Sequence, residues 1–157
     1  MKRLLVLAAC ALLATATFAQ KQLKSFDELM DALKSGQTVQ AVFHYHKCDL
    51  YTNGEKQKPM PEIVGGMHIE VYEYFATKAI GNPNAFVVSS TSKLIKNPLG
   101  EGYVYNYAKV KVAADNSVKI TAQYINPATF EVEMDEYFLT TVNDGKNDSG
   151  AYFYVSK

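Results

Sequence analysis

The sequence predicts an α+β fold, in which one N-terminal helix packs on a curved, mostly antiparallel sheet or a partly open β-barrel of about seven strands. Near the start, one segment repeats apolar residues with a helical period. Most of the remaining chain alternates with a period of two and is rich in Val, Ile, Tyr, Phe and Thr. Short turns of Asn, Asp, Pro and Gly separate these segments, and such turns join antiparallel neighbours because parallel strands need a longer crossover.

The predicted helix covers residues 26–34, where apolar residues recur at i, i+3, i+4 and i+7. Ser25 precedes it as an N-cap, and Glu28 stands where the acidic partner of a capping box belongs. Gly36 favours termination because glycine adopts the left-handed conformation that ends many helices.

Seven segments with strand periodicity follow the helix. They cover residues 39–48, 67–75, 85–91, 102–113, 118–125, 130–141 and 151–155. Residues 49–62 form the longest stretch without this pattern, so we predict an irregular loop there and a candidate functional surface. The Gly65-Gly66 step is expected either to take a positive φ or to let the backbone approach a neighbour closely.

The first nineteen residues have the pattern of a signal peptide. Lys2 and Arg3 precede an uncharged apolar run over residues 4–13, and Thr17 and Ala19 suit signal peptidase. We therefore predict a signal peptide over residues 1–19 and a single domain over 20–157. The run is too short to span a membrane, so the protein is expected to be secreted, into the extracellular space or a bacterial periplasm. In an alternative, Cys10 is lipidated and anchors the chain to a membrane.

Loss of the signal peptide removes the chain's only arginine. Taking Lys2 and Arg3 from the 16 basic residues leaves 14 lysines against 16 acidic residues, a net charge of about −2. Nucleic-acid binding needs a concentrated basic face, and bidentate phosphate capture normally uses arginine. The composition therefore argues against nucleic acid and anionic membrane surfaces as partners.

Cys48 is the only thiol of the predicted domain, so the fold has no internal disulfide. Three interpretations remain open. The side chain can be a small buried apolar group. It can form a disulfide-linked homodimer or pair with a partner's thiol. It can also be a reactive or metal-bound thiolate.

Three residues of metal-ligating types alternate at the end of the first predicted strand. His44, His46 and Cys48 would share one face of a continuous strand, and His68 is the remaining histidine. Imidazole and thiolate are ligands that zinc and copper prefer, so these four residues are a candidate site for Zn or Cu. The alternative is that the histidines are polar residues on a sheet face. No other cofactor is indicated.

Tyrosine is unusually frequent, with eleven residues and no tryptophan. Two rows alternate along predicted strands: Tyr103, Tyr105 and Tyr107, and Tyr72 and Tyr74. Lys109 and Lys111 continue the first row on the same face. Tyrosine rings combine apolar area with a polar tip, which suits a ligand pocket or a contact surface. Aromatic packing between neighbouring strands explains the rows equally well.

The chain contains none of the sequence motifs for a nucleophile elbow, a phosphate-binding glycine loop or a zinc-protease helix. We therefore predict a protein without enzymatic activity. A thiol-dependent enzyme, the less favoured alternative, would need a base within about 3 Å of the Cys48 sulfur. Asn147 begins an N-glycosylation sequon, which matters only in a eukaryotic source.

Several short motifs spread over most of the chain recur together in one known family. They are Phe26, Leu29, Leu33, Gly36, Val39, Cys48 and residues 63–69, 86–89 and 100–104. In these motifs the chain resembles the VirK family, small exported proteins for which no activity is established. The resemblance implies export, a single domain of this length, and a role discussed alongside virulence or host contact.

The chain departs from the family pattern in its tyrosine content, in its lack of a second mature cysteine, and in His44 and His46. The combined expectation is a secreted VirK-like protein that acts by binding or as an extracellular structural component. Its partner would be an extracellular protein, a matrix or a small ligand. The alternative is a metal- or small-ligand-binding module that uses the face carrying His44, His46 and Cys48.

Overall fold

The computed structural model describes residues 20–58 and 62–155, so the predicted signal peptide and Cys10 lie outside the described residues. The described part forms one α-helix, one 3₁₀-helix and eleven strands. In chain order they are β1 (Lys21–Leu23), α2 (Phe26–Lys34), β2 (Val39–His44), η1 (Tyr45–Lys47), β3 (Asp49–Thr52), β4 (Glu55–Lys56), β5 (Val64–Ile69), β6 (Glu73–Phe75), β7 (Phe86–Lys96), β8 (Tyr103–Ala113), β9 (Ser117–Ile125), β10 (Val132–Thr141) and β11 (Ala151–Val155).

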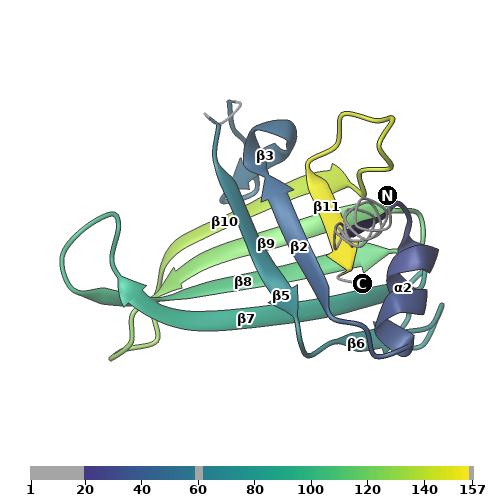
Figure 1. The fold of residues 1–157 in the computed structure, drawn as a ribbon. Helices are drawn as coiled ribbons and strands as arrows, with labels where there is room; N and C mark the ends of the chain where they lie inside the picture. Colours follow the sequence, from purple (N-terminus) through teal and green to yellow (C-terminus); the bar gives the residue numbers. More distant parts are fainter. Residues whose placement is uncertain (1–19, 59–61, 156–157) are drawn as a thin grey trace, which may run out of the picture.

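The strands form two sheets. The small sheet has the order β1-β11-β2-β5, and the large sheet has the order β4-β3-β10-β9-β8-β7-β6. Every strand pairing between these elements is antiparallel. In Figure 1, β2, β5 and β11 of the small sheet cross the long strands β7 to β10 of the large sheet. Both sheets are open, with edge strands at either side, so the described residues form no closed barrel.

The predicted single curved sheet or partly open barrel of about seven strands is therefore wrong. Two segments predicted as continuous strands each pass from one sheet to the other. Residues 39–48 contain β2 of the small sheet, then η1, after which the chain enters β3 of the large sheet. The predicted strand over residues 67–75 likewise contains the end of β5, a break at residues 70–72, and then β6 of the large sheet. Strands that switch sheets in this way make the corners of packed two-sheet folds.

The first crossing depends on a glycine far along the chain. The amide of His44 donates to the carbonyl of Gly150 at 2.9 Å, which holds the end of β2 against the segment that leads into β11. A Cβ atom at position 150 would lie 2.5 Å from the Cys48 sulfur and 2.6 Å from the His44 carbonyl oxygen. Only glycine therefore fits at this crossing without a shift of its neighbours.

The predicted irregular loop is partly ordered into a hairpin. Within residues 49–62, β3 pairs with β4 across Asn53 and Gly54, whose φ values are +53° and +82°. Two consecutive positive φ angles are what a tight β-hairpin turn requires, and Asn-Gly is its preferred sequence. The prediction of a loop was therefore wrong for residues 49–56, and residues 59–61 lie outside the described part.

The helix prediction is confirmed at both ends. The Ser25 hydroxyl accepts from the Glu28 amide at 3.2 Å. The Glu28 carboxylate accepts from the amide of Lys24 at 3.0 Å, one residue earlier than a capping box places it. Gly36, at φ +75°, ends the helix as predicted.

One hydrophobic cluster lies between the two sheets and takes in the apolar face of α2. Its fully buried members include Phe43 on β2, Phe153 on β11, Ile120 on β9 and Leu29 on the helix. The helix therefore contributes to a core shared by two sheets, and the expectation of a helix packed on a single sheet is corrected. Burial of side chains of this size stabilises the fold by about 1.5–3 kcal/mol each.

The two glycines of β5 serve close approach, one of the two predicted alternatives. Neither has a positive φ. A Cβ atom at Gly66 would lie 2.5 Å from the Ala41 carbonyl oxygen, and one at Gly65 would lie 2.8 Å from the Tyr45 ring. Because these two residues lack a Cβ atom, β5 can pair with β2 close to that ring.

No helix among the described residues is both long and apolar enough to cross a lipid bilayer.

Candidate functional site

The large sheet has one covered and one open face. Side chains such as Val110, Ile120 and Phe138 point toward the small sheet and join the core. Their neighbours on the opposite side, such as Lys109 and Lys119, are exposed. Because side chains alternate along a strand, the residues of this opposite side form a continuous second surface, which we call the outer face.

Aromatic and lysine side chains form a row across the outer face. In the order β6, β7, β8, β9, β10, β3, the row is Phe75, Phe86, Lys111, Lys119, Tyr137 and Tyr51. The rings at its two ends stack in pairs, with centroids 4.8 Å apart on β6 and β7 and 4.9 Å apart on β10 and β3. The ammonium nitrogen of Lys111 lies 3.9 Å from the Phe86 centroid, and that of Lys119 lies 4.0 Å from the Tyr137 centroid.

The two lysines are direct partners in the pairing of β8 with β9. Like charges in this position destabilise a sheet, by roughly 0.2–1 kcal/mol on the scale of cross-strand pairs. Cation–π contacts at exposed sites stabilise the fold by about 0.5–1 kcal/mol each, which offsets this repulsion. The ion pairs among the described residues involve Lys47 and Lys56, so neither Lys111 nor Lys119 has a carboxylate within 4.0 Å there. The outer face thus holds two adjacent cations without an acidic partner.

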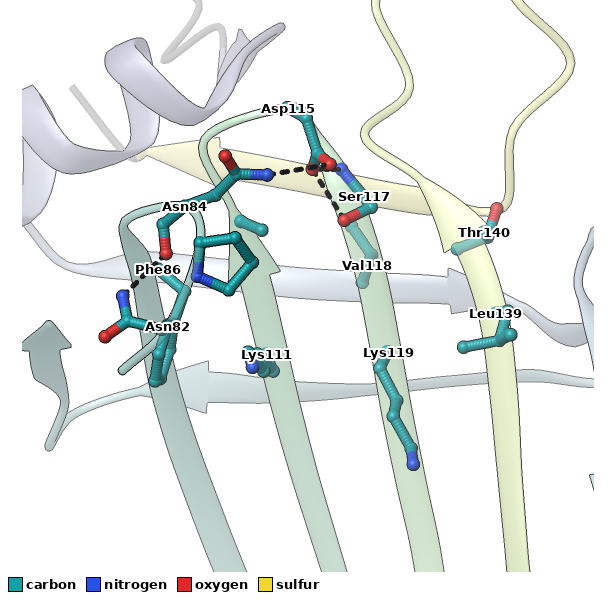
Figure 2. A pocket seen from close by; sticks show the side chains of 12 residues that line it. Asn82, Asn84, Phe86, Lys111, Asp115, Ser117, Val118, Lys119, Leu139 and Thr140 are labelled. Atoms are coloured by element: carbon teal, nitrogen blue, oxygen red, sulfur yellow. Dashed lines mark hydrogen bonds between the residues drawn. The ribbon is translucent and has the colours of Figure 1, made fainter. Parts of the chain in front are cut away.

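A pocket of about 380 Å³ lies beside these lysines (Figure 2). Its walls are mostly apolar and come from β7 to β10 and the turns at their ends. The side chains that line it on the outer face are Pro83, Phe86, Lys111, Ala113, Lys119 and Leu139, with Asn82, Asn84, Asp115 and Ser117 at the rim. The volume falls within the range of small-molecule sites, about 300–1,000 Å³.

The rim is rigid on the side of the β8–β9 turn. The Asp115 carboxylate accepts from the Ser117 hydroxyl at 2.6 Å, from the Ser117 amide at 3.0 Å and from the Asn84 side chain at 3.4 Å. These hydrogen bonds, the Ser117 hydroxyl foremost, hold the pKa of Asp115 below its usual value. The carboxylate is therefore ionised at neutral pH and already engaged by its own turn.

The same turn is tied to two other parts of the fold. The Asn116 side-chain oxygen accepts from the amide of Phe26 at 2.7 Å, which supplies a partner for the free N-terminus of α2. The Asn116 carbonyl accepts from the Val142 amide at 2.9 Å, just after β10. The pocket rim is consequently part of the rigid framework.

The opposite rim is the turn over residues 82–84. The Asn82 amide nitrogen donates to the carbonyls of Ala76 at 2.9 Å and Asn84 at 2.7 Å, and its oxygen accepts from the Ile80 amide at 3.0 Å. The Asn82 side chain is thus used by the turn. Within the described residues, the ammonium groups of Lys111 and Lys119 make no hydrogen bond and no ion pair, so they are the polar groups available to a ligand.

The predicted tyrosine rows separate in the structure. Tyr103, Tyr105 and Tyr107 lie on β8 in the same row as Lys109 and Lys111, hence on the outer face, with Tyr103 63% exposed. They extend the surface beside the pocket but do not line it.

Tyr72 and Tyr74 do not join that row. Tyr72 lies between β5 and β6 and packs against the core. Tyr74 pairs with Val87, a core residue, and Lys34 lies 5.1 Å from its ring centroid. These two tyrosines thus lie on the opposite side of the large sheet.

The predicted metal ligands are not brought together. β2 ends at His44, so the single-sided row does not form; the rings of His44 and His46 lie 5.8 Å apart and nearly perpendicular. His68 pairs with Gln40, four residues from His44 along β2 and hence roughly 13 Å away. Among the described residues no group of three or more His, Cys, Asp and Glu side chains is placed to hold a metal.

Cys48 is a buried free thiol, 8% exposed and part of the hydrophobic core. Its sulfur donates to the His44 carbonyl oxygen at 3.4 Å. Burial is the main cause that raises the pKa of the thiol. A hydrogen bond with Thr140 lowers this pKa, and the negative charge of Asp49 raises it further. A buried neutral thiol agrees with the apolar interpretation, and a disulfide to a second chain would require this site to open.

Asn147, the predicted sequon residue, lies in the exposed turn before β11, where its amide nitrogen donates to the Val142 carbonyl at 3.0 Å.

Sequence reasoning missed most of the pocket. Lys119 and Leu139 were not singled out, and Phe86 was named only within the 86–89 family motif, because these are ordinary strand residues until the strands are paired. One signal was present: the three-residue turn 114–116 fixes the register of its hairpin and places Lys111 opposite Lys119.

Comparison with known proteins gives two findings. The family model described as VirK protein matches residues 22–130. Among solved structures, the crystal structure of a VirK family protein from Legionella pneumophila superposes with a TM-score of 0.64 at 16% sequence identity, covering 84% of this chain and 97% of that chain. At this identity the likeness shows a shared fold. No curated protein matches the sequence.

Proposed function

This chain belongs to the VirK family, and from that premise we propose that it is an exported, non-enzymatic binding protein whose ligand docks on the outer face of the large sheet. The export component rests on the signal-peptide pattern of residues 1–19. The binding component rests on the surface chemistry of the fold.

One observation carries the proposal: the outer face is open and combines apolar, aromatic and cationic side chains. Its exposed large hydrophobic residues include Leu94 at 55%, Tyr103 at 63%, Val132 at 50% and Leu139 at 38%. Leu139 borders the pocket, and the other three lie toward the far end of the face. Exposed apolar residues that gather on one face suit an interaction site. The pocket at one end of the face supplies a concave site lined by two lysines.

The chemistry of Cys48 supports a role without catalysis. Its sulfur donates to the backbone carbonyl of His44, and its raised pKa keeps the thiol protonated at neutral pH. A thiol-dependent enzyme needs a thiolate and a neighbouring base. The proposed binding site does not involve Cys48.

A second candidate is a structural component that self-associates through the same face. Leu94, Tyr105, Ile125 and Val132 are successive partners across β7, β8, β9 and β10, so they form an exposed apolar row at the end far from the pocket. Two copies could bury such rows against each other.

The test is a fragment screen by amide chemical-shift mapping on isotope-labelled protein purified after export. The proposal expects shifts that cluster on outer-face residues, and protein that remains monomeric in sedimentation. Shifts confined to the small sheet or to the grooves between the sheets would contradict it. Concentration-dependent dimerisation that Leu94→Glu abolishes and Leu99→Glu leaves intact would favour the structural role instead.

A further inference from the structure

We infer that the pocket of Figure 2 binds a small amphiphilic anion, whose carboxylate or similar oxyanion lies between Lys111 and Lys119 and whose apolar body lies against Phe86, Pro83 and Leu139. This inference rests on the proposed binding role of the outer face and names the chemical class of its ligand.

The charge of the ligand follows from the lysine pair. Each ammonium group offers three donors and no acceptor, and each is left without a carboxylate among the described residues. The Lys111 ammonium group lies over the Phe86 ring on β7, and the Lys119 ammonium group lies over the Tyr137 ring on β10. An oxyanion that draws both side chains inward would accept charge-assisted hydrogen bonds from both. Because Lys111 and Lys119 are cross-strand partners, their side chains emerge at neighbouring points of the sheet, about 5 Å apart at Cβ.

The apolar body follows from the rest of the lining. Leu139 is the direct partner of Lys119, and Phe86 is the direct partner of Ala113, so apolar groups flank the charges on both sides. An inorganic anion would leave this surface in contact with water. A neutral apolar molecule would leave both ammonium groups without a partner. An amphiphile satisfies both parts of the site.

The pocket is already formed before any ligand binds. Its two rims are joined directly, by the amide of Ala114 donating to the Ala85 carbonyl at 2.9 Å and by the Asn84 to Asp115 contact at 3.4 Å. A preformed site keeps the ordering penalty of binding small.

The single acidic group at the rim sets the orientation of the ligand. Asp115 lies four residues from Lys111 along the chain and four from Lys119, at the turn end of the pocket, away from the ammonium groups (Figure 2). Its ionised carboxylate repels an anion at that end. The oxyanion is thereby directed to the lysines and the apolar tail toward the turn.

The test compares three probes by calorimetric titration of the full exported protein: decanoate, decanol and inorganic phosphate. Decanoate carries both features, decanol lacks the charge and phosphate lacks the apolar body. We expect decanoate to bind at least about ten-fold more tightly than either, since a hydrogen bond to a charged group is worth a factor of this size. Raising the salt concentration should weaken the binding of decanoate and leave the binding of decanol unchanged.

Substitutions locate the effect. Lys111→Gln and Lys119→Gln should each lower the affinity for decanoate about ten-fold, whereas Lys109→Gln should leave this affinity unchanged. Lys109 is a matched control because it lies on the same strand and the same face as Lys111 but does not line the pocket. Thermal melting of each variant verifies its fold, and the comparison of probes on the unsubstituted protein needs no variant.

Equal affinity for decanoate and decanol, or equal effects of Lys109→Gln and Lys111→Gln, would overturn the inference. If decanoate fails to bind while other fragments still perturb the outer face, the ligand class is wrong and the binding role stands. If no compound perturbs that face, both are wrong.

Discussion

Replacing Gly150 by alanine tests the crossing between the two sheets. Its φ lies outside the positive range, so alanine adds no backbone strain, and the effect on the folded state comes from the new methyl group. That methyl would lie 2.5 Å from the Cys48 sulfur and 2.6 Å from the His44 oxygen, so the crossing must open by about 1 Å to restore ordinary contact distances. Overpacking of this kind costs about 1–3 kcal/mol, and the lower entropy of the unfolded alanine chain returns about 0.4–1 kcal/mol.

We therefore expect Gly150→Ala to lower the free energy of unfolding by about 1–2 kcal/mol, measured by urea denaturation. Gly100→Ala is the control, because a Cβ there meets its nearest neighbour at an ordinary 3.5 Å. Adding Cys48→Ala should remove the sulfur contact and recover part of the loss, as a coupling of roughly 0.5–1 kcal/mol. If Gly150→Ala is as stable as Gly100→Ala, the crossing is not as tightly packed as described and the reasoning fails.

Three further predictions concern stability and reactivity. Asn116→Gly, which keeps the positive φ but removes the acceptor for the Phe26 amide, should lower unfolding free energy by about 1 kcal/mol in urea; an unchanged midpoint would exclude that hydrogen bond as an anchor of α2. Folding lowers the pKa of Asp115, so its contribution to stability is present above the pKa of the unfolded state and is lost as the pH falls through the pKa of the folded state. Asp115→Asn should therefore flatten the pH dependence of the melting temperature between about pH 5 and pH 2. Parallel curves for the two proteins would contradict this. Cys48 should react with a thiol reagent at the rate of unfolding, so rapid labelling of native protein would refute its burial.

The helix and its ends were predictable because their signals are local. Ser25, Glu28 and Gly36 act within one turn of the residues they cap, so spacing alone identifies them. The strands over residues 102–113 and 118–125 were also close to those observed, since alternation and turn residues bound them clearly.

The two-sheet architecture was not predictable from the same signals. The alternation of β2 continues through Tyr45 and His46, so residues 39–48 look like one strand. What bends the chain there is contact with Gly150, about a hundred residues later. The expected single-sided row of His44, His46 and Cys48 does not form for the same reason, because it assumed one continuous strand.

The candidate site was predictable in part. The row of Tyr103, Tyr105 and Tyr107 lies on the same strand and face as Lys111, and the short turn after that strand fixes Lys119 as the partner of Lys111. The apolar walls were not predictable, since Phe86 and Leu139 reach the pocket from strands that pair only in the folded sheet. Strand order is a tertiary property that one sequence does not encode locally.

The most direct test of the binding account is the set of nuclear Overhauser effects between bound decanoate and the protein. The account predicts contacts from the alkyl chain to the Phe86 ring and the Leu139 methyl groups, with the carboxylate end beside the side-chain methylenes of Lys111 and Lys119. Contacts to His68 and Ile95 instead, in the groove between the sheets, would contradict it.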